Sequence, residues 1–330
     1  METETPVSRT VYEELRVQGV TRRGFLQFCA SMATLLALPA SAAKTIEEAL
    51  TTRARPSVIW ISIQECTGCS ESLLRSFEPT LEGLILDQLS LDYHHVLQAA
   101  AGHQAEAARD GAIKKNWGKY VLIVDGGIAL GADGALSTTG GRSGVDILRD
   151  AAEGAALIVA VGTCASFGGI PAAAPNPTQA TGTMQALQAL REQGRIKAPI
   201  INVPGCPPVP EVMTGVIVNY LTFGKPPTLD DLLRPLPFFG RTVHDDCPRL
   251  PFYNQGLFAK SFDDEGARKG YCLLELGCKG TVTYNACTTV KWNQATSFPM
   301  KAGHGCLGCA QPAFWDRKGG FYGSIVQSKS

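Results

Sequence analysis

An α/β fold with a doubly wound parallel sheet is predicted for residues 56–235 of this 330-residue chain. Short runs of aliphatic and β-branched residues recur there, and each is followed by a glycine-bearing turn and a stretch of helical character. Strands that alternate with helices are typical of a parallel sheet. Over residues 236–330 prolines and glycines become frequent and periodic stretches disappear. The sequence therefore predicts a second, small and mostly irregular domain there.

Five apolar runs are the expected strands of this sheet. They cover residues 58–63, 84–91, 120–124, 156–161 and 199–203. Helices are expected from Ser70 and over residues 96–117, 144–153, 181–192 and 209–223. In such a sheet the carboxyl ends of the strands meet at one rim, where ligands bind. The loops that follow the strands are therefore the first place to look for a site.

Residues 1–43 have the pattern of a targeting peptide that is cleaved. The pair Arg22-Arg23 precedes an apolar stretch over residues 28–38, and small residues for cleavage follow at 39–43. A twin-arginine pair is typical of the pathway that exports folded proteins. We therefore expect a periplasmic protein that receives any cofactor before export. No other apolar run is long enough to span a bilayer, so we expect no transmembrane helix and at most peripheral contact with the membrane.

The composition excludes several classes of function. The 30 lysines and arginines balance the 30 aspartates and glutamates, so no basic field exists to attract nucleic acid. The sequence contains no phosphate-cradling glycine loop, no nucleophile–base arrangement and no hydrolytic pair of carboxylates. We therefore expect no catalytic residue on this chain itself.

Cysteine spacing is the strongest chemical signal. Only Cys29 of the eleven cysteines lies in the expected signal peptide. Cys66 and Cys69 are separated by two residues, as are Cys306 and Cys309, a spacing that suits chelation. An exported chain can also form disulfides. Dense disulfides usually compensate for a small core, however, and a chain of this length does not need them. Metal ligation is therefore favoured over a disulfide framework.

Four cysteines follow strands of the predicted sheet. Cys66 and Cys69 come after the first strand, Cys164 after the fourth and Cys206 after the fifth. Their thiols should therefore meet at one rim. Four soft thiolates suit zinc or a 4Fe-4S cluster. A thioredoxin-like redox pair is the alternative for Cys66 and Cys69, but the two further cysteines on the same rim argue against it.

The second domain contains a mixed set of candidate ligands. The pattern His244-x-x-Cys247, together with Cys272 and Cys278, supplies three sulfurs and one imidazole. Zinc is the alternative to an iron–sulfur cluster for such a set. Replacing a thiolate by neutral imidazole makes a cluster site less negative and should raise its reduction potential. The remaining cysteines form a third set, Cys287, Cys306 and Cys309.

The segments around the rim cysteines resemble the small subunit of nickel–iron hydrogenases. They read Glu65-Cys66-Thr67-Gly68-Cys69-Ser70-Glu71-Ser72, Gly162-Thr163-Cys164-Ala165-Ser166-Phe167-Gly168-Gly169 and Pro204-Gly205-Cys206-Pro207-Pro208. The resemblance extends from the signal to about Asp316. It implies a flavodoxin-like first domain and a partner large subunit that carries the nickel–iron centre.

The resemblance also implies two 4Fe-4S clusters and one 3Fe-4S cluster. The proximal 4Fe-4S cluster, nearest the large subunit, would be held by Cys66, Cys69, Cys164 and Cys206. The distal 4Fe-4S cluster would be held by His244, Cys247, Cys272 and Cys278. The medial 3Fe-4S cluster would be held by Cys287, Cys306 and Cys309, with Pro299 near its vacant corner. His304 would have no ligand role, and we expect it to make a structural hydrogen bond.

By the same resemblance, hydrogen is split on the large subunit in the direction of uptake. Electrons then pass from the proximal to the medial to the distal cluster, and leave near His244 for a cytochrome or an iron–sulfur protein. Oxygen-tolerant relatives carry two extra cysteines, at positions that match Gly68 and Gly169 here. The resemblance therefore implies a standard, oxygen-sensitive enzyme.

Two other classes of protein are weighed against this one. A related subunit of the respiratory quinone-reducing complex would share the sheet and the proximal set but would lack the C-terminal cysteines. A non-enzymatic exported zinc or disulfide protein would contain no iron.

Overall fold

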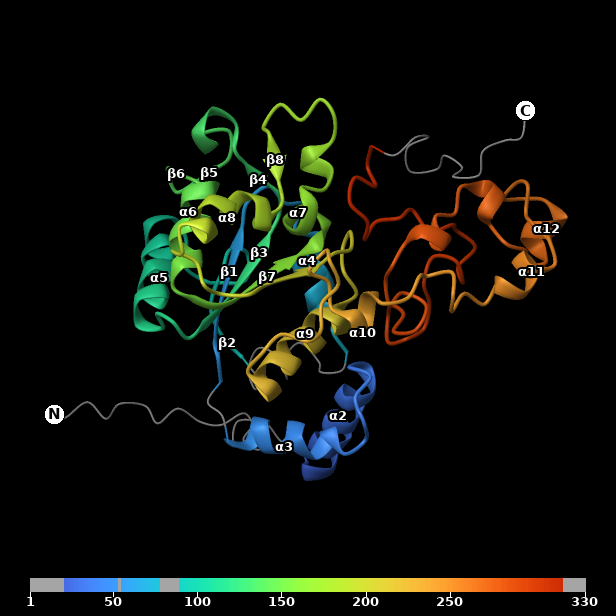
Figure 1. The fold of residues 1–330 in the computed structure, drawn as a ribbon, viewed down its shortest axis with the longest axis horizontal. Coiled ribbons are helices and arrows are strands. Elements are labelled where there is room, and N and C mark those ends of the chain that lie inside the picture. The colour runs from blue at the N-terminus through green and yellow to red at the C-terminus, as the bar shows by residue number, and fades with distance from the viewer. Residues whose placement is uncertain (1–20, 53–54, 78–88, 317–330) are drawn as a thin grey trace.

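A five-stranded parallel sheet forms the centre of the computed structural model, which describes residues 21–52, 55–77 and 89–316 (Figure 1). Its strands are β1 (Ser57–Ser62), β2 (Ser90–His94), β3 (Tyr120–Asp125), β7 (Ala155–Val161) and β9 (Ile200–Val203). Their spatial order is β2-β1-β3-β7-β9, all parallel. Counted along the chain this is the flavodoxin-like order 2-1-3-4-5. The predicted α/β fold is confirmed.

Two apolar clusters cover the two faces of this sheet. Successive side chains of a strand point to opposite faces, so Leu122 and Ile158 join one cluster while Val121 and Val159 join the other. The first cluster includes the apolar faces of α5 (Gly102–Lys115), α6 (Gly144–Glu153) and α8 (Thr183–Glu192). The second is built mainly on α9 (Pro210–Phe223), with α2 (Arg22–Leu35) and α3 (Ala42–Thr52) packed against it.

Most expected helices have the predicted bounds to within two residues, and α6 matches its prediction at both ends. The prediction for residues 96–117 was wrong at its start. The chain turns after β2, where the Gln98 amide donates to the His94 carbonyl, and α5 begins only at Gly102. The strand prediction over 84–91 was also wrong at its end, because Tyr93 and His94 pair with β1. Its residues 84–88 lie outside the described part of the chain.

Short elements fill the loops at the carboxyl rim of the sheet. They are α4 (Gly68–Leu74), β4 (Ile128–Ala129), β5 (Thr138–Thr139), β6 (Arg142–Ser143), α7 (Gly162–Phe167) and β8 (Ala180–Thr181), with 3-10 turns at Gly131–Gly134 and Ile170–Ala172. The helix α7 follows β7 directly, α4 follows β1 after the loop that contains Cys66, and each helix carries a candidate cysteine ligand.

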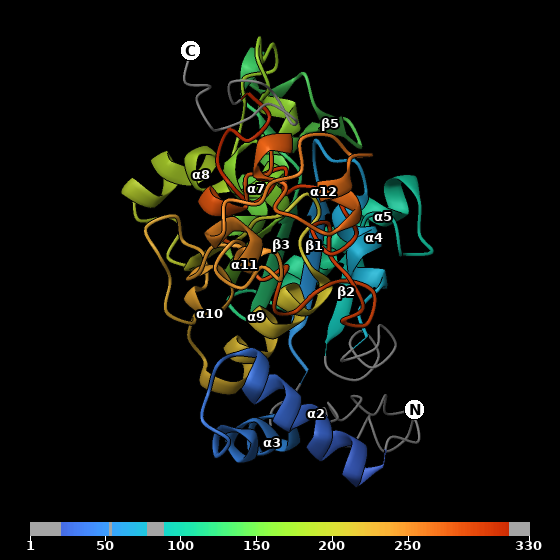
Figure 2. The same cartoon turned by 90° about the vertical axis from the view of Figure 1, so that its right-hand side faces the viewer.

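Little regular structure follows α9 in the part of the chain that the structure describes. The only helices there are α10 (Leu236–Phe239), α11 (Leu250–Asn254) and α12 (Glu265–Arg268), with 3-10 turns at Leu274–Leu276 and Gly280–Val282. This segment lies beside the sheet, next to α4 and α7, and faces the viewer in Figure 2. None of the helices within the described ranges is both long and apolar enough to cross a membrane.

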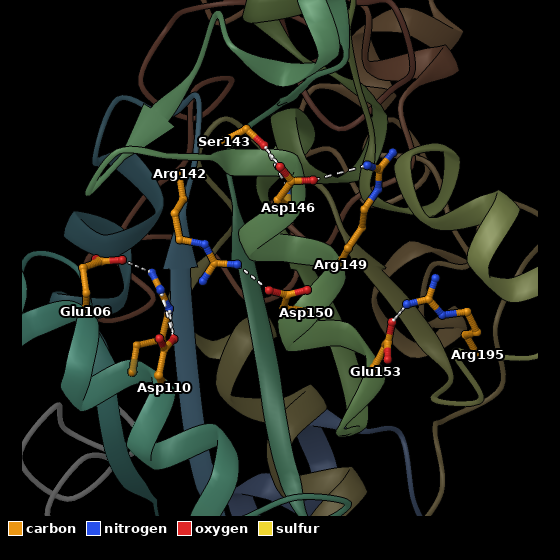
Figure 3. A network of polar contacts seen from close by, with 10 residues as sticks. Glu106, Asp110, Arg142, Ser143, Asp146, Arg149, Asp150, Glu153 and Arg195 are labelled. Atoms are coloured by element: carbon orange, nitrogen blue, oxygen red, sulfur yellow. Dashed lines mark hydrogen bonds and ion pairs between the residues drawn. The ribbon is translucent and has the colours of Figure 1, made fainter.

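Charged residues gather on the side of α5 and α6, away from the C-terminal segment (Figures 1 and 3). Arg109 is almost fully buried and pairs with Glu106 at 2.6 Å and Asp110 at 3.0 Å. Arg142 pairs with Asp150. A buried guanidinium is tolerated when carboxylates satisfy it, and here both carboxylates come from α5 itself, whereas the second pair joins β6 to α6.

The helix α2 is part of the expected signal peptide and packs onto the body of the protein. Its residues Phe25, Cys29 and Met32 are buried in the cluster built on α9. Arg22 and Arg23 at its start are exposed. The apolar stretch of the signal is therefore helical and covered on one side, while its arginine pair faces solvent.

His94 ends β2 and is almost fully buried. Its ring stacks on Trp60 with centroids 4.8 Å apart. Nδ1 accepts a hydrogen bond from the Val96 amide at 3.3 Å, so the proton is on Nε2, which lies 3.4 Å from Ser70 Oγ. Burial lowers the pKa of His94 to about 4, so folding requires the neutral imidazole.

Acid should therefore destabilise the fold through His94. The pKa of His94 is lower in the folded chain than in the unfolded chain, so its contribution to stability is complete above pH 6.5 and is lost as the pH falls toward 4. Going from pH 7 to pH 5 should cost about 2 kcal/mol of unfolding free energy at this residue. Urea unfolding at both pH values should show a smaller loss in His94→Phe than in the wild type. The exposed His103→Gln should behave like the wild type, and the same loss in His94→Phe would contradict this assignment.

Candidate metal centres

Four cysteines lie together at the carboxyl rim of the sheet. Cys66 is in the loop after β1, Cys69 is in α4, Cys164 is in α7 and Cys206 follows β9. The loops are tied to one another, because the Thr163 amide donates to the Gly205 carbonyl at 2.9 Å. The chain topology thus brings these residues to one place, as the sequence predicts.

The electrostatics of these thiols show how near they are to one another. Burial raises the pKa of Cys164 to about 12, with Cys206 and Cys66 contributing in the same direction. Burial also raises the pKa of Cys69 well above its ordinary value, and nearby Cys164 and Cys206 add to it. These thiols can therefore bind as thiolates only to a cationic partner, and their binding to that partner must release protons.

Glycines allow the backbone to approach these sulfurs. A Cβ on Gly162 would lie 2.5 Å from Cys69 Sγ, and one on Gly68 would lie 3.1 Å from Cys66 Sγ. Gly162 also has φ +85°, which L side chains rarely adopt. The lack of a side chain at Gly162 and Gly68 therefore leaves the space that the sulfurs of Cys69 and Cys66 occupy.

Asp125 is a rim residue that sequence reasoning missed. It ends β3 at the same edge, is almost fully buried, and lies close enough to the Cys69 thiol to add to the rise in the pKa of that thiol. Burial raises its pKa to about 7. Residues Asp125-Gly126-Gly127 read as a turn in the sequence. In the sequence, only its position at the end of a predicted central strand could have pointed to a place at the rim.

Three further cysteines form a buried second set. Burial raises the pKa of Cys287, Cys306 and Cys309 to about 12 in each case, and each thiol is also raised by another member of the set. Phe298 and Met300, on either side of Pro299, pack in the apolar cluster that contains Cys306. These three cysteines are brought together by the fold.

His304 makes the kind of structural contacts that the sequence predicts. Its amide donates to the Pro299 carbonyl at 2.9 Å, and its ring Nδ1 donates to the Gly305 carbonyl at 2.8 Å. The ring also stacks on the exposed Phe262 with centroids 5.8 Å apart. The His304 ring therefore already has a hydrogen-bond partner and a stacking partner, at the loop that leads into Cys306.

The third set surrounds a small cavity in the C-terminal segment. His244, Cys247, Cys272 and Cys278 all line it. Burial lowers the pKa of His244 and raises the pKa of Cys247 and Cys272. The structure thus offers a neutral imidazole and three sulfurs around one space, which is a donor set suited to a soft metal cluster.

The three sets form a row in which the set of Cys287, Cys306 and Cys309 is central. At one end, the backbone of Cys206 adjoins the Cys309 thiol, and the Thr163 hydroxyl donates to the Cys309 carbonyl. At the other end, the Cys306 amide donates to Cys278 Sγ at 3.2 Å. The central set therefore contacts both of its neighbours.

The donor chemistry is that of iron–sulfur proteins. Cysteine sulfurs in sets of four and three, together with one imidazole, are the ligands such clusters use. All eleven cysteines carry free thiols in the structure. Over residues 21–52, 55–77 and 89–316, no three histidine, cysteine or carboxylate side chains close around a point where a single metal ion would bind.

Two family models match the chain. The C-terminal family of the NiFe/NiFeSe hydrogenase small subunit matches residues 239–322. The family of the NADH ubiquinone oxidoreductase 20 Kd subunit matches residues 66–220. The second match begins after β1 and takes in the rest of the sheet with its rim, whereas the first covers the irregular segment.

Curated relatives match almost the whole chain. The uptake hydrogenase small subunit of Afipia carboxidovorans is 50% identical over 318 residues, which is 96% of this chain and 84% of the relative. The uptake hydrogenase small subunit of Azotobacter vinelandii is 48% identical over 95% of this chain and 85% of the relative. The hydrogenase-1 small chain of Escherichia coli K12 is 47% identical over 96% of this chain and 83% of the relative.

Solved structures agree with these matches. The Ni-Fe-Se hydrogenase of Desulfomicrobium baculatum in a reduced, active form matches with a TM-score of 0.76 and 35% identity, over 82% of this chain and 99% of that one. The [NiFeSe] hydrogenase of Desulfovibrio vulgaris Hildenborough matches with a TM-score of 0.75 and 36% identity, over 83% of this chain and 99% of that one. These proteins share both the fold and a substantial part of the sequence.

Proposed function

Since the chain belongs to the small-subunit family of nickel–iron hydrogenases, whose catalytic site is on a partner large subunit, we propose that it carries electrons away from hydrogen oxidation in an uptake enzyme. The observation that carries the proposal is the row of three cysteine sets, each in contact with the next. Two of the relatives are named uptake hydrogenase small subunits, which supports the direction of turnover.

The proposed ligand sets follow the row. The proximal 4Fe-4S cluster is assigned to the rim set of Cys66, Cys69, Cys164 and Cys206. The medial 3Fe-4S cluster is assigned to Cys287, Cys306 and Cys309, and the distal 4Fe-4S cluster to His244, Cys247, Cys272 and Cys278. When bound, these clusters supply one-electron transfer.

The chain's own residues prepare these sites. Apolar side chains pack around thiols of the medial and distal sets, and glycines admit the sulfurs to the rim. The neutral His244 makes the distal site less negative than four thiolates would. We place electron exit at this set, toward a cytochrome or an iron–sulfur acceptor.

We further propose export by the twin-arginine pathway with cleavage after residue 43, to the periplasm. The exposed Arg22 and Arg23 at the start of an apolar helix support this. The mature chain would then consist of a flavodoxin-like domain over residues 56–235 and a cluster domain over residues 236–330. The change from layered to irregular structure after α9 supports that boundary.

Oxygen sensitivity with an ordinary proximal cubane is part of the proposal. Gly68 and Gly169 stand where the oxygen-tolerant pattern needs cysteines, and glycine donates no ligand. A Cβ on Gly169, which has φ +61°, would also collide with Cys164. A ligand at residue 169 would therefore require the rim to rearrange.

The match to the quinone-reductase subunit family favours a second candidate, an electron-transfer subunit with the rim set alone. That candidate gives no role to the medial and distal sets. The match of residues 239–322 to the hydrogenase C-terminal family favours the first proposal.

Iron analysis of the purified complex with its large subunit tests the proposal. We expect about eleven iron atoms on this chain, from two four-iron clusters and one three-iron cluster, in addition to the iron of the nickel–iron centre on the large subunit. Electron paramagnetic resonance should show a three-iron signal in the oxidised protein that disappears under hydrogen. About four iron atoms would support the second candidate, and zinc or disulfides without iron would contradict both.

A further inference from the structure

Arg249 lines the distal cavity, although neither its spacing nor its residue type marks it as a ligand. It lies two residues after Cys247, and its side chain faces the same space as the four assigned ligands. Among the described residues that line this cavity it is the only arginine or lysine. A cation therefore adjoins a site that would hold three thiolates.

The guanidinium group joins three segments of the irregular domain. Its Nε donates to the Met300 carbonyl at 2.8 Å, and its Nη1 donates to the Tyr271 carbonyl at 2.6 Å. Tyr271 precedes the ligand Cys272, and Met300 lines the cavity itself. The Arg249 side chain thus links the loop of Cys247 to the loop of Cys272, and both of them to the segment around Met300.

Only arginine fits both contacts. Its planar fork carries several N–H donors in fixed directions, whereas the lysine ammonium is a point charge on a flexible stem. Lysine at this position would keep a positive charge but could not reproduce the two donors in this geometry. The described part of this domain contains only isolated strand bridges, such as those between Phe258 and Cys272 and between Thr242 and Tyr284. The two hydrogen bonds of Arg249 therefore add to the few backbone contacts that order its loops.

The charge of Arg249 also acts on the ligands. The guanidinium lines the same cavity as Cys247 and Cys272, so its positive charge attracts the negative charge of a cluster held there. The same attraction favours the more negative, reduced form of any cluster held by these sulfurs.

We propose that Arg249 is a positioning residue that fixes the distal ligand loops and raises the reduction potential of the cluster they hold. The inference rests on the proposed function, since it presumes an iron–sulfur cluster at the distal set. It adds a residue outside that set which adjusts the last step before electrons leave the chain.

A redox titration of the purified two-subunit enzyme, followed by paramagnetic resonance of the distal cluster, tests the proposal. Arg249→Gln should shift the midpoint to lower potential. At the wild-type midpoint, the oxidised form should then be in about tenfold excess, which corresponds to about 60 mV. Arg249→Lys should show a smaller shift and should lose distal iron faster on heating. The exposed Arg268→Gln, on the nearby α12, is the matched control and should leave the midpoint unchanged.

Each outcome decides for or against the proposal. Selective loss of the distal signal in either Arg249 variant, with the other two signals intact, supports the positioning role. Wild-type midpoint and iron retention in both variants would overturn it. Absence of all three signals from the wild-type enzyme would instead refute the proposed function, so the two failures are distinguishable.

Discussion

Replacing Cys206 by serine should abolish hydrogen-dependent dye reduction, with a loss of at least about 100-fold. Cys206 belongs to the rim set, which is the set nearest the proposed partner site. It is also the member of that set that adjoins Cys309 of the central set. A serine hydroxyl is a harder and less acidic donor than a thiol, so it holds iron poorly. We expect about four fewer iron atoms per chain.

Dye reduction and iron content in the purified two-subunit enzyme measure this effect. The matched control is Cys29→Ser, analysed in the uncleaved precursor. Cys29 is also buried, but it lies in α2 outside all three sets. Its iron content should equal that of the wild type. Undiminished activity and full iron in Cys206→Ser would show that the rim set is not the proximal site.

The sheet could be predicted because its strands carry strong local signals. The runs that become β3 and β7 are aliphatic and buried, and α6 has a capping serine, Ser143, before an amphipathic stretch. The edge strand β2 was misplaced because it pairs with one neighbour only. Its charged Asp92 and its buried His94 do not form an apolar run.

The rim set could be predicted from topology, since the ends of parallel strands converge. The grouping of the C-terminal cysteines could not be derived from topology, and in the sequence it rested on the resemblance to the hydrogenase small subunits. That segment lacks periodicity, and its shape depends on contacts such as that between Arg249 and the Met300 carbonyl, 51 positions apart. Asp125 and Thr163 were missed because a buried aspartate at the end of a strand and a buried threonine at the start of a helix have no distinctive spacing. Their roles are visible only once the strands are assembled.

Replacing Gly162 by alanine should remove the proximal cluster without altering any ligand. The new Cβ would lie 2.5 Å from Cys69 Sγ, closer than any real contact, at a residue with φ +85°. The backbone cannot easily move aside, because the next residue donates its amide to the Gly205 carbonyl and its hydroxyl to the Cys309 carbonyl. The collision therefore displaces Cys69.

Gly194→Ala separates this collision from simple backbone strain. Gly194 also has a positive φ, +72°, but no atom lies within 4 Å of its would-be Cβ. It should cost about 1–2 kcal/mol of unfolding free energy and leave the iron content intact. Gly162→Ala should cost more than this and should lose about four iron atoms per chain. Thermal unfolding and iron analysis of the two variants measure both effects. Equal iron in both would mean that the rim tolerates a side chain at residue 162, and that close approach of backbone to sulfur is not what shapes the proximal site.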